Sequence, residues 1–372
     1  MGDRQGAVAA MGLNHRRPDH RRPDPAFWSG KRVLLTGHTG FKGSWAALWL
    51  ERLGATVTGL AKAPDQDPSL FELAGVAEAV DSHFVDLRDQ AAVEALVASR
   101  PFDIVLHMAA QPIVRAAVED PVEAFATNVM GTAHLLQALR GQPTLKAVLA
   151  VTTDKVYANA DTGRAFVEGD ALGGKDPYSG SKAACEIAVA SFARTYFDRL
   201  GTPVATARGG NVIGGGDYSR DRLVADVVRS VKAGRPLALR HPEATRPWQH
   251  VLDCVAGYLV YLEALAQEAD TPRAMNFGPE PGGAVITVGE LATAALEALG
   301  GPPWRHEPDP ASVEARLLAI DTTLAGQRLG FASRLDGPAA VAWTMDWHKA
   351  EAAGQDLRQA TFDQIAAYER LP

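Results

Sequence analysis

RVLLTGHTGFKGSW, residues 32–45, places three glycines directly after a short apolar run. The glycines stand at 37, 40 and 43, and the helical pattern GSWAALWLERLG continues from the last of them. In such a strand–loop–helix unit the first glycine permits a tight turn. The second lets the backbone approach a pyrophosphate, and the third lets the helix pack on the strand. The stretch therefore predicts a dinucleotide-binding loop at the positive end of a helix, with glycines that serve only turns as the alternative.

Apolar runs alternate with helical segments through the first 208 residues. Unbroken apolar strands between helices are typical of a parallel sheet covered on both faces, and right-handed crossovers make it a doubly wound, Rossmann-type α/β fold. Ligands of such folds bind beyond the carboxyl ends of the strands. The expected strands are RVLL (32–35), TVTGL (56–60), HFVDL (83–87), DIVLHMAA (103–110), KAVLAV (146–151) and VATAR (204–208).

The regular alternation weakens after Arg208, which indicates a second part of the chain. Residues 1–26 contain the repeat HRRPD twice and are expected to form a disordered basic, proline-rich tail. We expect residues 27–208 to form the dinucleotide-binding domain, with a later segment around 247–278 returning to it. Residues 209–372 should form mainly a smaller α/β lobe that binds the substrate.

Composition excludes several classes of protein. The chain has 372 residues, 47% of them hydrophobic, and a net charge of −7, which argues against a general nucleic-acid binder. Cys185 and Cys254 are too few for a disulfide framework or a structural zinc site, and no metal site is expected. No apolar run reaches the ~20 residues needed to cross a bilayer, and no secretory signal is visible. We therefore expect a cytoplasmic protein without a membrane partner.

Two further stretches carry the residues of acid–base chemistry. In DPYSGSK, Tyr178 and Lys182 lie four residues apart on a predicted helix, so both project from one face. Tyrosine has a reference pKa near 10, which a neighbouring ammonium would lower, so that the phenolate could remove the proton of an alcohol. In TTDKVY, residues 152–157, the acidic Asp154 and the basic Lys155 stand together at the carboxyl end of a predicted strand.

These motifs, together with VDL at 85–87, HMAAQ at 107–111 and the segment around Asn128, resemble the extended short-chain dehydrogenase/reductase family from Phe27 onward. Within that family, FKGSW, TTDKVY, DPYSGSK, GNVIGGGD and RPWQHV are similar to the CDP-glucose 4,6-dehydratases. The resemblance implies NAD as the cofactor and a nucleotide-diphosphate hexose, foremost CDP-glucose, as the partner. It implies oxidation at carbon 4 of the sugar, loss of water across carbons 5 and 6, and return of the hydride to carbon 6, in deoxysugar biosynthesis such as that of O-antigen.

The resemblance also implies roles for individual residues. Tyr178, supported by Lys182, takes the proton of the carbon 4 hydroxyl, and Thr153 hydrogen-bonds the carbon 4 oxygen. Asp154 is the acid for the departing hydroxyl, although its reference pKa of about 3.9 would have to be raised by burial. Lys155 stands where related dTDP-glucose dehydratases have a glutamate. It is either the base at carbon 5 or a charged group that steadies the enolate.

The remaining site residues follow from the same motifs. The cofactor is expected to contact Gly37, Thr39, Gly40, Phe41, Lys42, Gly43, Asp86, Leu87, Ala109, Ala110, Gln111, Asn128, Thr152, Tyr178 and Lys182. The substrate is expected to contact Asn211, Arg222, Arg246 and His250. Asp86 is placed to accept from the adenine amino group, or alternatively to cap the helix that begins near Asp89. The second strand ends without an acidic residue, and Lys62 there leaves NADP open.

Other readings of the chain stay open at this point. A nucleotide-sugar 4-epimerase would share the fold, NAD and the Tyr178–Lys182 pair, but such relatives usually lack an acid–base couple after the fifth strand. A 4,6-dehydratase for another nucleotide hexose is a second alternative, and a non-catalytic NAD-binding scaffold is a third. The resemblance also implies a homodimer or homotetramer assembled through the helices around 113–140 and 178–200.

Overall fold

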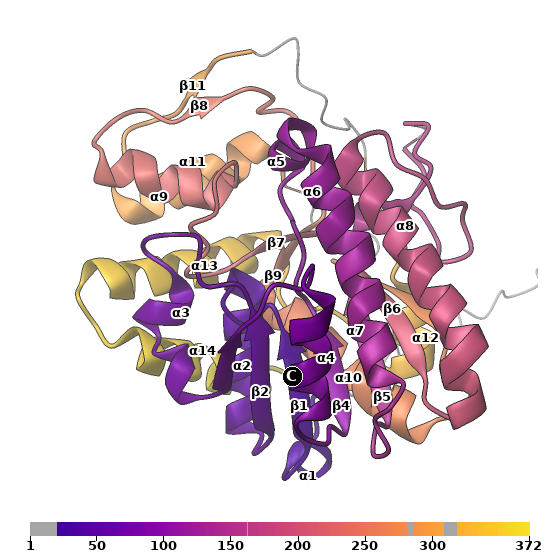
Figure 1. Ribbon diagram of the computed structural model, residues 1–372. Helices are drawn as coiled ribbons and strands as arrows, with labels where there is room; N and C mark the ends of the chain where they lie inside the picture. Colours follow the sequence, from indigo (N-terminus) through magenta and orange to yellow (C-terminus); the bar gives the residue numbers. More distant parts are fainter. Residues whose placement is uncertain (1–20, 162, 281–285, 309–317) are drawn as a thin grey trace, which may run out of the picture.

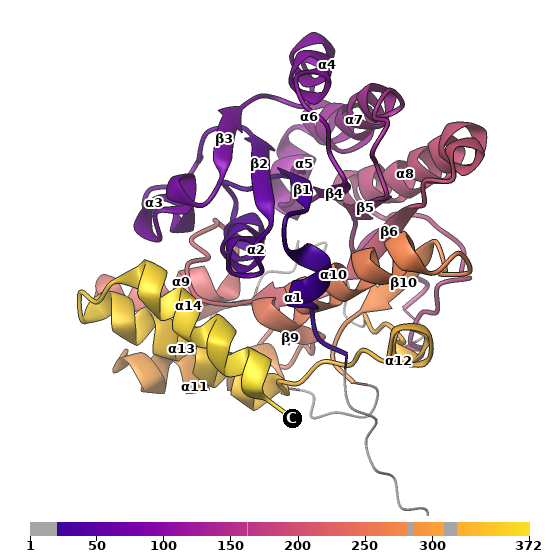
Figure 2. The same cartoon turned by 90° about the horizontal axis from the view of Figure 1, so that it is seen from below.

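Seven parallel strands form the central sheet of the computed structural model, which describes residues 21–161, 163–280, 286–308 and 318–372. Their order is β10-β6-β5-β4-β1-β2-β3 (Figure 2). From β1 the chain adds β2 and β3 on one side, and then β4, β5, β6 and β10 on the other, so the order switches between β1 and β4. The predicted doubly wound parallel sheet is therefore confirmed, with its ligand-binding switch point beside the glycine loop. The strands are β1 (Arg32–Thr36), β2 (Thr56–Ala61), β3 (Asp81–Phe84), β4 (Ile104–His107), β5 (Ala147–Val151), β6 (Val204–Gly209) and β10 (Ala274–Phe277).

Two of these strands differ from the sequence-based expectation. β3 begins two residues before the apolar run HFVDL and ends at Phe84, so that Asp86 lies in the loop beyond it. β10 is an edge strand that pairs with β6 from Thr206 to Gly209. Its sequence, AMNF, is too short to stand out from the surrounding loops.

Side chains of the central strands alternate between two buried clusters. Val33 and Leu35 of β1 pack in one cluster with α2 (Phe41–Arg52) and α10 (Val251–Gln267). Leu34 points the other way into a second cluster that is built from α4, α7 and α8. Figure 2 shows these helices as layers on opposite sides of the sheet. A strand buried on both faces needs an apolar side chain at every position, which explains the unbroken runs in the sequence. The second layer comprises α4 (Gln90–Ala98), α7 (Thr132–Leu139) and α8 (Pro177–Phe192).

The C-terminal half divides between the sheet and a separate lobe. Helices α9 (Leu223–Lys232) and α11 (Val288–Leu299), with the short pair β8 (Ala238–Leu239) and β11 (Arg305–His306), lie beyond the carboxyl ends of the sheet strands (Figure 1). α10 and β10 return to the sheet. α14 (Leu357–Arg370) packs on α2, where the rings of Tyr368 and Trp49 lie 5.6 Å apart. The other elements are α1 (Pro25–Trp28), α3 (Leu70–Leu73), α5 (Val114–Glu119), α6 (Pro121–Phe125), β7 (Asn211–Ile213), β9 (Trp248–His250), α12 (Thr323–Leu329) and α13 (Gly337–Ala352).

The described part of the chain begins at Arg21, before Phe27. Residues 1–20 of the expected tail lie outside the described residues, but Arg22 donates to the carbonyl of Leu371 at 2.6 Å and Arg21 pairs with Glu268 at 3.1 Å. Asp24 caps α1 by accepting from the amide of Ala26 at 2.9 Å. The end of the predicted tail thus lies against the C-terminal helix. In the described segments, no helix combines the length and apolarity needed to span a membrane.

Candidate active site

The glycine loop forms a cradle that has no room for side chains. Gly37 has a φ of +77°, and a Cβ there would lie 2.7 Å from the amide nitrogen of Ala109. A Cβ on Gly43 would lie only 1.9 Å from the carbonyl oxygen of Gly37. Helix α2 starts after Gly40 with no side-chain cap, which leaves the N–H groups of its first turn available to a ligand. The loop therefore fits a pyrophosphate held at a helix N-terminus.

The carboxylate of Asp86 is engaged by a neighbouring arginine. Arg88 donates to it through Nη2 at 2.6 Å and through Nε at 3.0 Å, and these hydrogen bonds lower the pKa of Asp86. The cap of α4 is Asp89, which accepts from the amide of Ala92 at 3.0 Å. The alternative capping role for Asp86 is therefore wrong. Asp86 follows the carboxyl end of β3, and the glycine loop follows the carboxyl end of the parallel strand β1, so both lie at the same edge of the sheet.

Asn128 shapes the loop that follows β4. Its Oδ1 accepts from the amide of Gln111 at 2.8 Å, and its Nδ2 donates to the carbonyl of Gln111 at 3.2 Å and to Ser181 at 2.9 Å. Asn128 is buried, and it joins the loop that contains Ala109 and Ala110 to helix α8. Leu87 is also buried, directly against Gly131, where a Cβ would lie 2.8 Å from the leucine Cβ. These two predicted cofactor residues thus position the loop walls around the switch point.

His38, inside the glycine loop, is a residue that sequence reasoning missed. Its Nε2 lies 2.6 Å from the hydroxyl of Ser82, and burial lowers the pKa of His38 to about 4, so the ring is neutral near pH 7. A Cβ on Gly59 would lie 2.5 Å from this ring, which accounts for the glycine near the end of β2. Thr39 bonds the carbonyl of Lys62 at 2.9 Å, and the Lys62 ammonium lies 3.9 Å from Glu123.

Tyr178 and Lys182 lie on one face of α8, both buried at the end of β5. The ammonium of Lys182 donates to the carbonyl of Val151 at 2.9 Å. Burial raises the pKa of Tyr178, while a hydrogen bond with Thr153 and the charge of Arg222 act in the opposite direction. Burial is the largest of these effects, so the pKa of Tyr178 is raised overall, and its lowering by Lys182 together with a bound nicotinamide stays a prediction. Burial also lowers the pKa of Lys182, and the charge of Lys42 adds to that effect.

The segment after β5 brings Thr153, Asp154 and Lys155 together. The chain leaves the extended conformation at Asp154, where the short 3₁₀ turn Asp154–Val156 begins. Asp154 is fully buried, and its Oδ1 accepts from Lys155 Nζ and from the hydroxyl of Thr153, each at 3.0 Å. Its Oδ2 is buried with no hydrogen-bond partner among the described residues. A buried carboxylate oxygen without a partner is costly in a folded protein and points to a functional role.

The four predicted substrate residues are placed differently. Asn211, at the start of β7, accepts from Lys155 Nζ at 3.3 Å and so belongs to the catalytic cluster. Arg222, which precedes α9, donates to the carbonyl of Pro112 at 3.4 Å, and its charge reaches Tyr178. Arg246 lies in the segment leading into β9, the strand paired with β7. Asn211 and Arg222 thus lie near the catalytic cluster, whereas Arg246 is placed only by the pairing of β9 with β7.

His250 has another place. Its ring is fully buried between Trp45 and Trp343, with ring centres 6.3 and 6.0 Å away, and its Nδ1 caps α10 by accepting from Leu252. Burial lowers the pKa of His250 to about 3, so it is an uncharged packing residue. The structure does not bring it to the catalytic cluster.

Lys42 is directed into the protein. Its ammonium lies 5.8 Å from the ring centre of the buried Tyr258 on α10, close enough to Lys182 to affect that residue's pKa. Sequence reasoning missed Tyr258, because nothing in a helical stretch such as VAGYLVYLEAL marks the tyrosine that faces the site. It also missed Glu186 and Arg208, although a charged residue at the end of the apolar run VATAR was a usable signal.

The comparisons with known proteins agree with this geometry. A family model described as NAD dependent epimerase/dehydratase family matches residues 33–278. The chain is 38% identical to the CDP-glucose 4,6-dehydratase of Salmonella typhimurium over 353 residues, which cover 93% of this chain and 98% of that protein. It is 30% identical to a dTDP-glucose 4,6-dehydratase of Streptomyces niveus, with 86% and 93% of the two chains covered.

A solved structure shows the same architecture. The UDP-glucose 4-epimerase of Thermus thermophilus, in complex with NAD, superimposes with a TM-score of 0.72 at 27% identity, covering 85% of this chain and 98% of that one. The residues that the family model matches include the strands of the sheet, the glycine loop and the Tyr178–Lys182 pair. The chain belongs to the NAD dependent epimerase/dehydratase family.

Proposed function

We propose that the protein is an NAD-dependent nucleotide-sugar 4,6-dehydratase that converts CDP-glucose to CDP-4-keto-6-deoxyglucose and water. The observation that carries this proposal is the contact between the buried Asp154 and Lys155 at the end of β5, beside Thr153 and Tyr178. Oxidation and re-reduction of one carbon need only Tyr178 and Lys182, whereas loss of water also needs an acid and a base. The similarity to a CDP-glucose 4,6-dehydratase supports both the reaction and the sugar nucleotide.

Gly37, Gly40 and Gly43 would hold NAD, which when bound would supply the hydride acceptor for carbon 4 of the sugar and the hydride donor for carbon 6. Tyr178 is the base for the carbon 4 hydroxyl. Thr153, which hydrogen-bonds Tyr178, is placed to hold the same oxygen. Lys182 is fixed on α8 by its hydrogen bond to the carbonyl of Val151, and from there its charge assists the phenolate.

Elimination falls to Asp154 and Lys155. In the neutral form of the pair, Asp154 carries a proton and Lys155 is an amine. Asp154 gives its proton to the hydroxyl leaving carbon 6, and Lys155 removes the proton on carbon 5. The pair is then a carboxylate and an ammonium, which is the ion pair at 3.0 Å, and transfer of one proton from Lys155 to Asp154 restores the starting form. The unpartnered Oδ2 of Asp154 is the oxygen available to the sugar.

The diphosphate of the substrate calls for arginines, whose planar fork matches phosphate oxygens. Arg222 precedes α9 and Arg246 precedes β9, and we assign both to the diphosphate. Asn211 accepts a hydrogen bond from Lys155 Nζ, and we assign it to the substrate beside the catalytic cluster.

Product analysis tests the proposed function. The protein with NAD is incubated with CDP-, dTDP-, UDP- and GDP-hexoses, and the products are identified by mass and by the absorbance of keto sugars in alkali. A 4-keto-6-deoxy product from CDP-glucose is expected, with deuterium placed on carbon 4 recovered in the methyl group. A carbon 4 epimer without loss of water would show an epimerase instead, and NAD binding without turnover of any hexose would show a scaffold.

Replacing Lys155 with Met tests its part in elimination. We expect the rate of keto-sugar formation to fall by about 10²-fold or more, because general base catalysis contributes at least that factor. The affinity for NAD, followed by fluorescence titration, should not change, because Lys155 lies at the end of β5 and not at the glycine loop. Wild-type turnover in Lys155→Met would remove this residue from the mechanism.

We also propose a homodimer or homotetramer, in the cytoplasm, that serves deoxysugar biosynthesis such as that of O-antigen. α6, α8 and the π-helical turn Ala126–Gly131 expose a group of large apolar side chains. The side chains of Val122, Met130 and Ile187 are 76%, 52% and 62% exposed. Monomeric proteins rarely expose such apolar side chains together in one patch. A second copy of these helices would cover the patch.

Light scattering of the Val122→Glu/Ile187→Glu variant tests the assembly. The wild type should have two or four times the 39.5 kDa mass of one chain. The variant should have the mass of a single chain, because assembly would bury two unpaired carboxylates in each copy. Val167→Glu, a change at a 42% exposed apolar residue outside both predicted interface ranges, is the matched control and should keep the wild-type mass. A wild type that scatters as one chain would overturn this assembly.

A further inference from the structure

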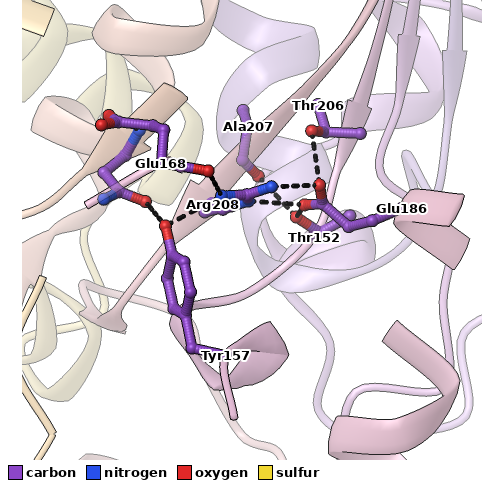
Figure 3. Close-up of polar contacts among 8 residues, drawn as sticks. Thr152, Tyr157, Glu168, Glu186, Thr206, Ala207 and Arg208 are labelled. Atoms are coloured by element: carbon purple, nitrogen blue, oxygen red, sulfur yellow. Dashed lines mark hydrogen bonds and ion pairs between the residues drawn. The ribbon is translucent and has the colours of Figure 1, made fainter. Parts of the chain in front are cut away.

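One buried ion pair lies behind the catalytic segment. Glu186 of α8 and Arg208 of β6 are each 4% exposed (Figure 3). Arg208 Nη2 donates to Glu186 Oε2 at 2.7 Å, and its Nε donates to Oε1 at 3.0 Å. Burial alone would lower the pKa of Arg208, but its hydrogen bonds to Glu186 and the charge of that carboxylate raise it overall, so the guanidinium stays charged.

Both ends of the segment 152–157 are bound to this pair. At the first end, the hydroxyl of Thr152 donates to Glu186 Oε1 at 2.5 Å. At the other end, the phenol oxygen of Tyr157 accepts from Arg208 Nη1 at 2.9 Å and donates to Asn276 at 2.6 Å. Figure 3 shows Thr152 and Tyr157 reaching the pair from opposite sides. Thr153, Asp154 and Lys155 lie between these two anchors.

The same pair is fixed to the helix of the catalytic tyrosine. Tyr178, Lys182 and Glu186 follow one another at intervals of four residues, so they lie along one face of α8. The position of Glu186 along the helix therefore sets the distance from the anchored segment to Tyr178. A hydrophobic pair could fill this space with equal stability, but it would fix neither hydroxyl.

We propose that Glu186 and Arg208 are positioning residues, which hold Thr153, Asp154 and Lys155 in register with Tyr178 and Lys182. The catalytic consequence rests on the proposed dehydratase function. The attachment of the segment 152–157 at both ends does not depend on that function. Neither side chain touches the sugar in this assignment, because every polar atom of the pair is used by protein groups.

Two threonines give a matched test. Thr152 and Thr206 each donate a hydroxyl to Glu186, at 2.5 and 2.9 Å, and both are buried. Only Thr152 belongs to the catalytic segment, since Thr206 lies within β6. Thr152→Val and Thr206→Val keep the shape of the side chain and leave the ion pair intact. Tyr157→Phe removes the anchor at the other end but keeps the ring stacked on Phe166.

Three measurements distinguish positioning from general stability. Amide hydrogen exchange over 152–157 should speed up in Thr152→Val and Tyr157→Phe but not in Thr206→Val. The kcat for keto-sugar formation should fall by about 10- to 10²-fold in the first two variants, as expected when reacting groups are misplaced by about 1 Å. The deuterium isotope effect on kcat, with sugar labelled at carbon 5, should rise in them because elimination becomes the slow step. A smaller folded fraction alone would not change that isotope effect.

The outcomes separate the two proposals. If wild type makes no keto product from any nucleotide hexose, the proposed function fails, and the exchange data still decide whether the segment is held by the pair. If wild type turns over but Thr152→Val behaves as Thr206→Val in exchange, rate and isotope effect, the positioning role is overturned. Titration with NAD, unchanged in Tyr157→Phe and Thr206→Val, shows that the effect of losing the Tyr157 anchor does not come from the cofactor site.

Discussion

Asp154→Asn is expected to lower kcat for keto-sugar formation by about 10²- to 10⁴-fold, the range of general acid–base catalysis. The amide keeps the size of the carboxyl group, so Thr153 and Lys155 retain a partner at Oδ1. It cannot supply the proton that the departing hydroxyl requires. The fully buried position of Asp154 means that solvent does not readily replace it as the acid. Product formation from CDP-glucose, followed as keto sugar in alkali, measures the loss.

Oxidation at carbon 4 supplies the internal control. Tyr178 and Lys182 are unchanged in Asp154→Asn, so the variant should still remove hydride from carbon 4 in a single turnover, seen as reduced nicotinamide. NAD affinity should equal that of wild type. An unchanged rate of keto-sugar formation would exclude Asp154 as the acid, whereas loss of both steps would mean that the substitution disturbs the whole site.

Arg208→Met is expected to lower the free energy of unfolding by about 3–5 kcal/mol, the usual cost of breaking a buried ion pair by removing one partner. The substitution leaves the carboxylate of Glu186 buried without its guanidinium. It also removes a hydrogen-bond donor to Tyr157 and to the carbonyl of Glu168, each at 2.9 Å. Denaturant unfolding, compared with wild type at one pH, measures the change.

The double variant Glu186→Gln/Arg208→Met is the matched control. It buries no unpaired charge, and the Gln carbonyl can still accept from Thr152 or Thr206. We expect the free energy of unfolding of the double variant to be higher than that of Arg208→Met, although the double variant has lost both charges of the pair. If Arg208→Met lost less than about 1 kcal/mol of its unfolding free energy, the Glu186 carboxylate could not be buried without a partner in that variant. Water or a shift of α8 would then have to take the place of the guanidinium.

Several features of the fold and the site could be predicted from residues close in sequence. The glycines at 37, 40 and 43 predicted the loop cradle, and at Gly37 and Gly43 a Cβ would collide with backbone atoms of the neighbouring strand loop and turn. The unbroken apolar runs predicted strands buried on both faces, and the four-residue interval of Tyr178 and Lys182 predicted one helix face. The predicted strand 146–151 also ended in the right place, because β5 ends at Val151 and a 3₁₀ turn begins at Asp154.

The sequence by itself thus determined the sheet, the cradle and the residue types of the catalytic cluster, since these depend on periodicity and spacing. Only the tertiary structure decided which distant groups meet. It placed His250 between two tryptophans, directed Lys42 toward Tyr258, and joined Glu186 to Arg208 behind the segment 152–157. It also decided that Tyr178 has a raised pKa. The physical reason is that burial and charge act through space, and their balance at an atom depends on neighbours that local sequence does not specify.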